Sequence, residues 1–320
     1  MSGVALGVLT GAVIVIALIV RSRIAIGVVL LAVVFIPVER MFALRRQKVL
    51  RRGWKTDLVH FLVNGLALNV GLAVVVVVVV GSALRAAVPH GVRSTIGAEA
   101  GWAQVAEAFL LAELGGYFGH RAAHRVPLLW RFHKVHHSIE EMDWLAASHL
   151  HPLDQVFIRS CAVLPVFALG FGKATLGAYA ALLTFQAIFI HSNVRFNFGP
   201  LRWLVATPQF HHWHHASEPT AYNSNFAGEF PVIDWMFGTL HLPRSAWPER
   251  YGVDTDQPVG YLSQLAWPFR RAGAGPVRAQ ARGYTAGGGP AGEGTAGGAG
   301  GRHRAIGLNE PAAWLPRRPV

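Results

Sequence analysis

Long apolar stretches dominate this chain, and short polar segments separate them. Residues 3–38 are almost wholly apolar apart from Arg21 and Arg23, and residues 58–84 contain seven successive valines, Val74–Val80. About 20 apolar residues in a helix are enough to cross the hydrocarbon core of a bilayer. We therefore expect residues 58–84 to form one membrane span. Residues 3–38 form either a tight hairpin of two helices or one long helix with a charged interruption.

Three further apolar stretches follow, at residues 102–119, 155–172 and 174–190. The last two are joined by a turn at residues 170–173. Each of these two is short for a full crossing, which predicts a tilted or re-entrant pair. The pattern predicts an all-α integral membrane helix bundle.

Composition supports a membrane protein. Hydrophobic residues make up 52% of the chain and charged residues 14%, against about 25% charged in typical soluble chains. The single cysteine, Cys161, excludes an intrachain disulfide and thiolate metal ligands. The net charge is +12, but basic residues gather at 45–55, beside an apolar span, and in the C-terminal tail. Such flanking charge marks the cytoplasmic side of a membrane, and we expect no nucleic-acid partner.

Histidines are concentrated in short boxes between the apolar stretches. Seven of the sixteen lie between His120 and His151, four more lie at residues 211–215, and His191 stands between the two groups. Imidazole is the commonest metal ligand in proteins. The grouping therefore favours a metal site over ordinary packing.

The spacing within the boxes fits helices, on which residues three or four apart share a face. One box has the form HxxxH and two have the form HxxHH. They supply eight candidate ligands: His120 and His124; His133, His136 and His137; His211, His214 and His215. A structural zinc ion closes with about four ligands. Eight imidazoles therefore indicate two ions.

Topology allows the boxes to meet. Starting from the basic loop, the spans at 58–84 and 102–119 return the chain to the face it left, and the 155–190 hairpin does the same. All boxes are then expected at the cytoplasmic face. Glu113, Tyr117, His120 and His124 step by four, three and four residues, so they form one stripe of a continuous helix. An acid on a membrane helix needs a partner, and we expect the histidine cluster to be the partner of Glu113.

The C-terminal tail is rich in Gly, Ala, Pro and Arg, a composition that cannot bury a core. We expect it to be disordered and expect no catalytic role for His303. The chain then divides into an N-terminal membrane segment with its basic loop, a span with a connecting loop, a histidine-box domain, a short extension and the tail: 1–57, 58–104, 105–242, 243–267 and 268–320.

The motifs GGYFGHRAAH, LWRFHKVHHS, FIHSN, TPQFHHWHHA and IDWMFGT, in that order, resemble the fatty acid hydroxylase and sterol desaturase superfamily of membrane di-iron oxygenases. The resemblance covers roughly residues 105–242. It adds His191 to the eight ligands, and it leaves open whether His149, His151 or His212 binds metal. Members often carry an acid and a tyrosine before the first box, where this chain has Glu113, in place of the more usual Asp, and Tyr117. We expect these two residues and Asn193 to lie beside the ligands.

The resemblance implies two iron ions, O₂ as co-substrate, and hydroxylation or desaturation of a C–H bond in a fatty acyl chain, a sterol or a related lipid. The sequence has no haem-binding signature, Gly-rich dinucleotide loop or cysteine cluster. A separate electron donor, a reductase, ferredoxin or cytochrome, is therefore implied. The alternative is a non-catalytic membrane metal-binding protein or a transition-metal transporter, since imidazole also suits zinc and copper. A transporter is expected to hold its ligands near the bilayer midplane, whereas these boxes lie at the ends of the spans.

Overall fold

The computed structural model describes residues 23–70, 76–196, 198–255 and 257–270, and all of its regular elements are helices. Within these residues the only β-pairing is two isolated bridges. The predicted all-α fold is confirmed to this extent. The start of the apolar N-terminal stretch and the predicted disordered tail, including His303, lie outside the described residues.

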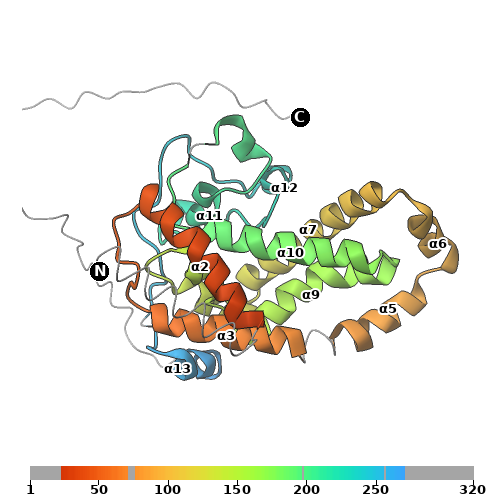
Figure 1. Cartoon of the computed structure of the whole chain (residues 1–320), viewed down its shortest axis with the longest axis horizontal. Coiled ribbons are helices and arrows are strands. Elements are labelled where there is room, and N and C mark those ends of the chain that lie inside the picture. The colour runs from red at the N-terminus through yellow and green to blue at the C-terminus, as the bar shows by residue number, and fades with distance from the viewer. Residues whose placement is uncertain (1–22, 71–75, 197, 256, 271–320) are drawn as a thin grey trace, which may run out of the picture. The chain divides into compact units, whose positions relative to one another are not determined.

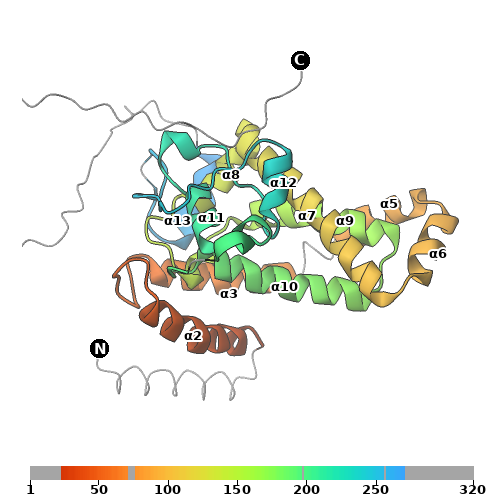
Figure 2. The same cartoon turned by 90° about the horizontal axis from the view of Figure 1, so that it is seen from above.

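Three long helices lie side by side (Figures 1 and 2): α7 (Gly101–Arg125), α9 (Pro152–Leu169) and α10 (Lys173–His191). Small residues such as Ala108, Ala112 and Ala162 are buried where α7 meets α9. Small side chains let helix backbones approach closely, which is how helices associate when lipid removes the hydrophobic drive. The α7–α9 contact therefore depends on residue size more than on polarity.

The helices α9 and α10 form the predicted hairpin. Within the described residues, Pro152–Leu169 and Ala174–His191 are the two helices long and apolar enough to cross a membrane. Gly170 ends α9 with a φ of +91°, a left-handed conformation that glycine adopts without steric cost. The turn thus falls within the predicted residues 170–173.

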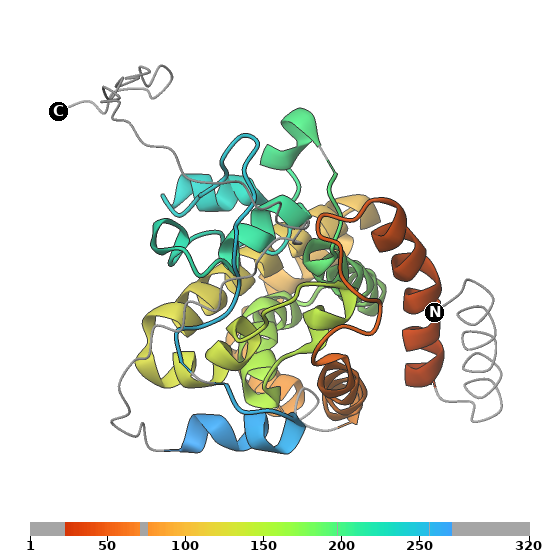
Figure 3. The same ribbon diagram turned by 90° about the vertical axis from the view of Figure 1, so that its left-hand side faces the viewer.

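The N-terminal helices pack beside this hairpin. Helix α3 (Trp54–Val70) lies between α2 (Arg23–Met41) and α13 (Tyr261–Ala266) in Figure 3, and it contacts both. The expected span 58–84 is not one described helix: α3 ends at Val70, and a π-helical turn (Val76–Val80) leads into α5 (Gly81–Ala87). Helix α6 (His90–Ala98) follows and leads back to α7.

Short helices gather at the opposite end of α7 and α10 (Figure 2). They are α8 (Pro127–His137), α11 (Pro208–His214) and α12 (Pro231–Met236), together with 3₁₀ turns at Trp144–Ser148, Gly199–Trp203, Pro219–Ala221 and Trp267–Phe269. Residues 127–131 form the first turns of α8. Proline is favoured at the first helical position, where its missing N–H costs nothing.

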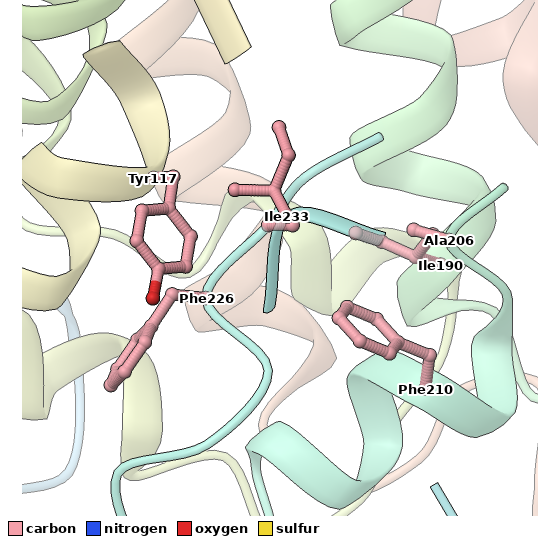
Figure 4. Packing of buried hydrophobic residues seen from close by; sticks show 7 residues of the cluster. Tyr117, Ile190, Ala206, Phe210, Phe226 and Ile233 are labelled. Atoms are coloured by element: carbon pink, nitrogen blue, oxygen red, sulfur yellow. The ribbon is translucent and has the colours of Figure 1, made fainter. Parts of the chain in front are cut away.

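One apolar cluster joins these short helices to the long ones. Figure 4 shows Tyr117 and Phe226 on one side, Phe210 and Ile190 on the other, and Ile233 between them. These residues come from α7, α10, α11, α12 and the loop before α12, and each is at most 3% exposed. The cluster therefore fixes the helix ends that carry the histidine boxes.

We expect Gly115→Ala to destabilise the protein, because a Cβ at this position would overlap the carbonyl oxygen of Cys161 on α9. Overpacking of this kind costs about 1–3 kcal/mol. The control is Gly116→Ala, whose Cβ would lie 3.7 Å from that of Ala162, an ordinary contact. Thermal unfolding in detergent should show a lower midpoint for the Gly115 variant only. Equal midpoints for the two variants would contradict the close approach of α7 and α9.

Candidate metal centre

Nine histidines gather in two groups at the end of the bundle. Cluster A contains His120, His124, His133, His137 and His214, and cluster B contains His136, His191, His211 and His215. Within each cluster, one ring nitrogen from every histidine lies within 4.8 Å of the others. The structure thus brings together all nine residues expected as ligands, including His191, the last residue of α10.

The two clusters are neighbours. The rings of His137 and His215 stack with centroids 4.4 Å apart, and the rings of His211 and His214 stack at 5.2 Å. Each of these pairs takes one histidine from cluster A and one from cluster B. The arrangement is therefore one centre with two adjacent binding positions.

Each HxxHH box serves both clusters. On α8, His133 and His137 are four residues apart and face cluster A, while His136 faces cluster B. The box on α11 does the reverse: His211 and His215 face cluster B, and His214 faces cluster A. Residues four apart share a helix face, whereas neighbouring residues are turned away from each other. The first box, HxxxH, contributes only to cluster A, from the last two turns of α7.

Acceptors fixed by the fold orient the imidazoles. The Nδ1 atom of His120 lies 2.7 Å from the carbonyl oxygen of Phe226, and that of His136 lies 3.1 Å from the carbonyl oxygen of His149. Further pairs are His214 with the carbonyl of Ser224 at 2.8 Å, His191 with that of Ala187 at 2.6 Å, and His133 with the carboxylate of Asp154 at 3.0 Å. Because these oxygens can only accept, each Nδ1 carries the proton and each Nε2 keeps its lone pair.

The lone pairs then converge. The Nε2 atoms of His120 and His133 are 3.1 Å apart, and those of His136 and His191 are 3.2 Å apart. With both protons on Nδ1, neither pair can form a hydrogen bond. The buried Nε2 atoms of His124 and His214 have no hydrogen-bond partner among the described residues either. Buried lone pairs that face one another repel unless a cation lies among them. The donor set, neutral imidazole throughout, fits a transition-metal ion in each cluster.

Burial keeps these rings uncharged. It lowers the pKa of His136 and His137 well below 6.5, and neighbouring histidines lower it further. Burial also lowers the pKa of His214 to about 3. At neutral pH the nitrogens are therefore free to bind a metal without first releasing a second proton.

The three histidines whose role was open lie outside both clusters. His151 caps α9, its Nδ1 accepting from the backbone N–H of Leu153 at 3.1 Å. His212 lies 2.7 Å from the Tyr251 hydroxyl and 3.1 Å from the carbonyl of Ser192. His149 lies 2.5 Å from a carboxylate oxygen of Asp57. Each ring therefore has a structural partner of its own.

Glu113 lies on the predicted helical stripe, but its partner is not the histidine cluster. Its carboxylate accepts from the backbone N–H groups of Glu229 and Phe230 at 3.0 and 3.1 Å. Seven residues of α-helix span about 10 Å, so a carboxylate on the same face as His120 is too far away to touch the cluster. Glu113 instead ties α7 to the loop before α12.

The side chains of Tyr117 and Asn193 also bind partners other than the cluster histidines. The Tyr117 hydroxyl lies 2.8 Å from that of Thr239, and its ring packs on Phe226, whose carbonyl orients His120. The Asn193 side chain binds the backbone N–H and carbonyl of Arg45. Within the described residues, the hydrogen bonds of both side chains go to groups other than the cluster imidazoles.

Asp234 is a supporting residue that was not predicted from the sequence, although it lies in the IDWMFGT motif. Its carboxylate accepts from the backbone N–H groups of Phe226 and Ala227 at 2.8 and 2.9 Å, and from the Thr239 hydroxyl at 2.6 Å. These bonds fix the loop that presents a carbonyl to His120. An acid inside an otherwise apolar motif was the available signal.

Comparisons with known proteins match the part of the chain that carries the two clusters. The fatty acid hydroxylase family model matches residues 105–239, which contain all nine cluster histidines. The chain is 32% identical to ornithine lipid hydroxylase OlsE of Rhizobium tropici over 170 residues, which are 53% of this chain and 51% of that protein. It is 33% identical to the alkylglycerol monooxygenases of Xenopus tropicalis and Homo sapiens, over 41% and 42% of this chain and 29% of each relative.

The chain thus spans about half the length of the ornithine lipid hydroxylase and under a third of the monooxygenases. No solved structure matches it. The histidine boxes and the family match agree, and both support the resemblance of residues 105–239 to the fatty acid hydroxylase and sterol desaturase superfamily.

Two adjacent histidines of the last box should behave differently. We expect His211→Gln to lower the bound metal by about half, because it removes one ligand of cluster B, and His212→Gln to leave the metal content unchanged. Glutamine can still hydrogen-bond but is a poor ligand for these ions. Elemental analysis of the purified proteins measures the difference. Equal metal loss in both variants would contradict the assignment of His212 to the packing.

The metal-free protein should lose stability as the pH falls. Burial lowers the pKa of His212 and of His214 to about 3, whereas an unfolded histidine titrates near about 6.5. Below about pH 6.5 the unfolded chain binds more protons than the folded one, so the free energy of unfolding decreases with falling pH. The unfolding midpoint of chelator-treated protein in detergent should be lower at pH 5 than at pH 7.5. A midpoint that is constant or higher at pH 5 would show that the rings are already charged when folded.

Proposed function

We propose that the protein is a multi-pass membrane oxidoreductase that holds two iron ions near the cytoplasmic surface and uses O₂ to hydroxylate or desaturate a C–H bond of a lipid. The observation that carries this proposal is the convergence of unprotonated imidazole nitrogens in two adjacent clusters. The family match and the lipid hydroxylases and monooxygenases among the relatives support it.

The proposed ligands divide five to four between the ions, as clusters A and B. Bound iron supplies the O₂ and one-electron chemistry that side chains cannot provide. The chain's own part is to hold the imidazoles in one tautomer, through the Nδ1 bonds to carbonyl groups and to Asp154. Fixed orientation of this kind avoids reorganisation of the ligands during the reaction.

Cluster A offers the more open side of the centre. His120 and His124 are partly exposed, whereas all four histidines of cluster B are buried. Trp130 lies beside His124, with ring centroids 5.2 Å apart, and the exposed apolar residues Phe118 and Leu128 lie on the same two helices. We infer that a hydrocarbon chain reaches the centre from the side of cluster A, past Trp130, and we assign the substrate to this side.

The relatives named for ornithine lipid and for alkylglycerol favour a substrate that joins a long hydrocarbon chain to a polar head group. A fatty acyl lipid fits this description best within the wider class of acyl lipids, sterols and related lipids. Electrons would come from a separate reductase, ferredoxin or cytochrome, because the sequence carries no redox-cofactor motif of its own.

The transporter alternative is less well supported. Transporters bind their cargo near the middle of their spans. Here His191 is the last residue of α10, His120 and His124 lie in the last turns of α7, and the other boxes are on short helices beyond them. Ligands at helix ends suit a centre that meets a lipid chain and an electron donor at the membrane surface.

We expect His136→Ala and His214→Ala each to abolish O₂-dependent lipid modification while leaving membrane insertion intact, because each removes a ligand from one cluster. Lipids from cells with and without the gene are compared by mass spectrometry for products that carry one more oxygen atom or lack two hydrogens. His303→Ala in the tail is the control and should retain full activity. Retained activity and iron in either cluster variant would refute the proposed function.

A further inference from the structure

A buried polar network from the N-terminal region lies directly behind cluster B. It consists of Arg51, Asp57, Asp143 and His149, which we call the Asp57 network. These residues are 1–6% exposed. Arg51 and Asp57 lie outside residues 105–239, the part of the chain that the family model matches. The network therefore adds N-terminal residues to the surroundings of the proposed metal centre.

The contacts run in one line from the network to a cluster B imidazole. Arg51 bridges two carboxylates, lying 2.5 Å from Asp57 and 2.6 Å from Asp143. The other Asp57 oxygen lies 2.5 Å from Nδ1 of His149. The backbone carbonyl of His149 in turn accepts from Nδ1 of His136 at 3.1 Å. Asp57 thus binds the ring of His149, and the backbone carbonyl of the same residue sets the tautomer of His136.

Helix α3 also fixes the backbone on both sides of this carbonyl. The Asn64 side chain donates to the carbonyl groups of Ser148 and Leu150 at 3.1 and 3.0 Å. The Ser148 hydroxyl donates to the Asp57 carbonyl at 3.0 Å, and the ring of His60 stacks on that of His149 with centroids 4.7 Å apart. Residues 148–150 therefore have little freedom to turn the His149 carbonyl away from His136.

We propose that Asp57 is a positioning residue for cluster B. By holding His149 it fixes the acceptor that keeps the proton on Nδ1 of His136 and directs Nε2 toward the ion. This inference rests on the proposed function, because it concerns a metal in cluster B. Loss of an outer hydrogen-bond partner typically weakens metal binding about 10–100-fold.

The carboxylate of Asp234 has the same relation to cluster A as that of Asp57 has to cluster B. Asp234 holds the backbone at Phe226, and the Phe226 carbonyl accepts from His120. Asp57 and Asp234 are both at most 1% exposed. Each contacts a residue whose backbone carbonyl accepts from a histidine of one cluster. The pair therefore provides matched variants, Asp57→Asn and Asp234→Asn, that separate a cluster-specific effect from a general loss of structure.

The test measures iron release from the full-length protein in detergent. Protein loaded with ferrous iron is mixed with a chelator, and the amount and rate of release are followed by absorbance. We expect Asp57→Asn to accelerate the release of half of the iron about tenfold or more and to leave the other half unchanged. Asp234→Asn should accelerate the release of the complementary half.

Ligand variants identify the halves. In a His211→Gln background, which lacks a cluster B ligand, Asp57→Asn should have no further effect on the remaining iron. In a His124→Gln background, which lacks a cluster A ligand, it should accelerate release of the remaining iron. Equal acceleration of both halves, or unchanged release, would overturn the positioning role.

A second variant covers the case in which Asp57→Asn does not fold. His149→Phe retains a ring that can stack on His60 and leaves the pair of Arg51 and Asp57 intact, but removes the contact between residue 149 and Asp57. It should accelerate release of the same half. Wild-type protein that binds no iron would refute the proposed function, whereas wild-type protein with two irons and an unaffected Asp57→Asn variant would refute only this inference.

Discussion

The structure depends on oxygen atoms that accept from one nitrogen of the cluster imidazoles and so leave the other nitrogen free to bind a metal. Uncharged histidine has one N–H and one lone pair, and the fold supplies oxygen atoms for Nδ1 of at least five of the nine cluster rings. The acceptors come from segments far apart in the sequence, such as Phe226 for His120 and His149 for His136. The helices and loops around the centre therefore position these carbonyl groups next to the imidazoles.

The sequence predicted which histidines gather but not how they are shared. Spacing placed His133, His136 and His137 on one short helix, and counting spans predicted that all boxes could meet at one face of the membrane. The division of each HxxHH box between two clusters depends on how α8 and α11 are rotated against each other. Tertiary packing sets this rotation, for α11 through Phe210 in the apolar cluster, and no local pattern encodes it.

The supporting residues were harder to predict for a similar reason. Backbone carbonyls orient four of the nine rings, and every residue has a carbonyl, so the sequence holds no signal for those at Ser224 or Phe226. Asp154 contacts Nδ1 of His133 from 21 residues further along the chain, and no local pattern links the two residues. Asp57 lies about 80 residues before its target His136, next to a basic loop, and only the tertiary fold brings it to the centre. Glu113 was placed on the correct face of α7, but the rise along the helix takes it away from the rings.

The sharing of boxes between clusters has a geometric consequence for the centre as a whole. Because α8 and α11 each contribute to both binding positions, neither position can move as a unit away from the other without breaking a helix. The distance between the two metal-binding positions is therefore set by the helical rise of about 1.5 Å and the rotation of about 100° per residue. A pair of ions held in clusters A and B would keep a nearly constant spacing, which suits the proposed centre to relatives that are named for different lipids.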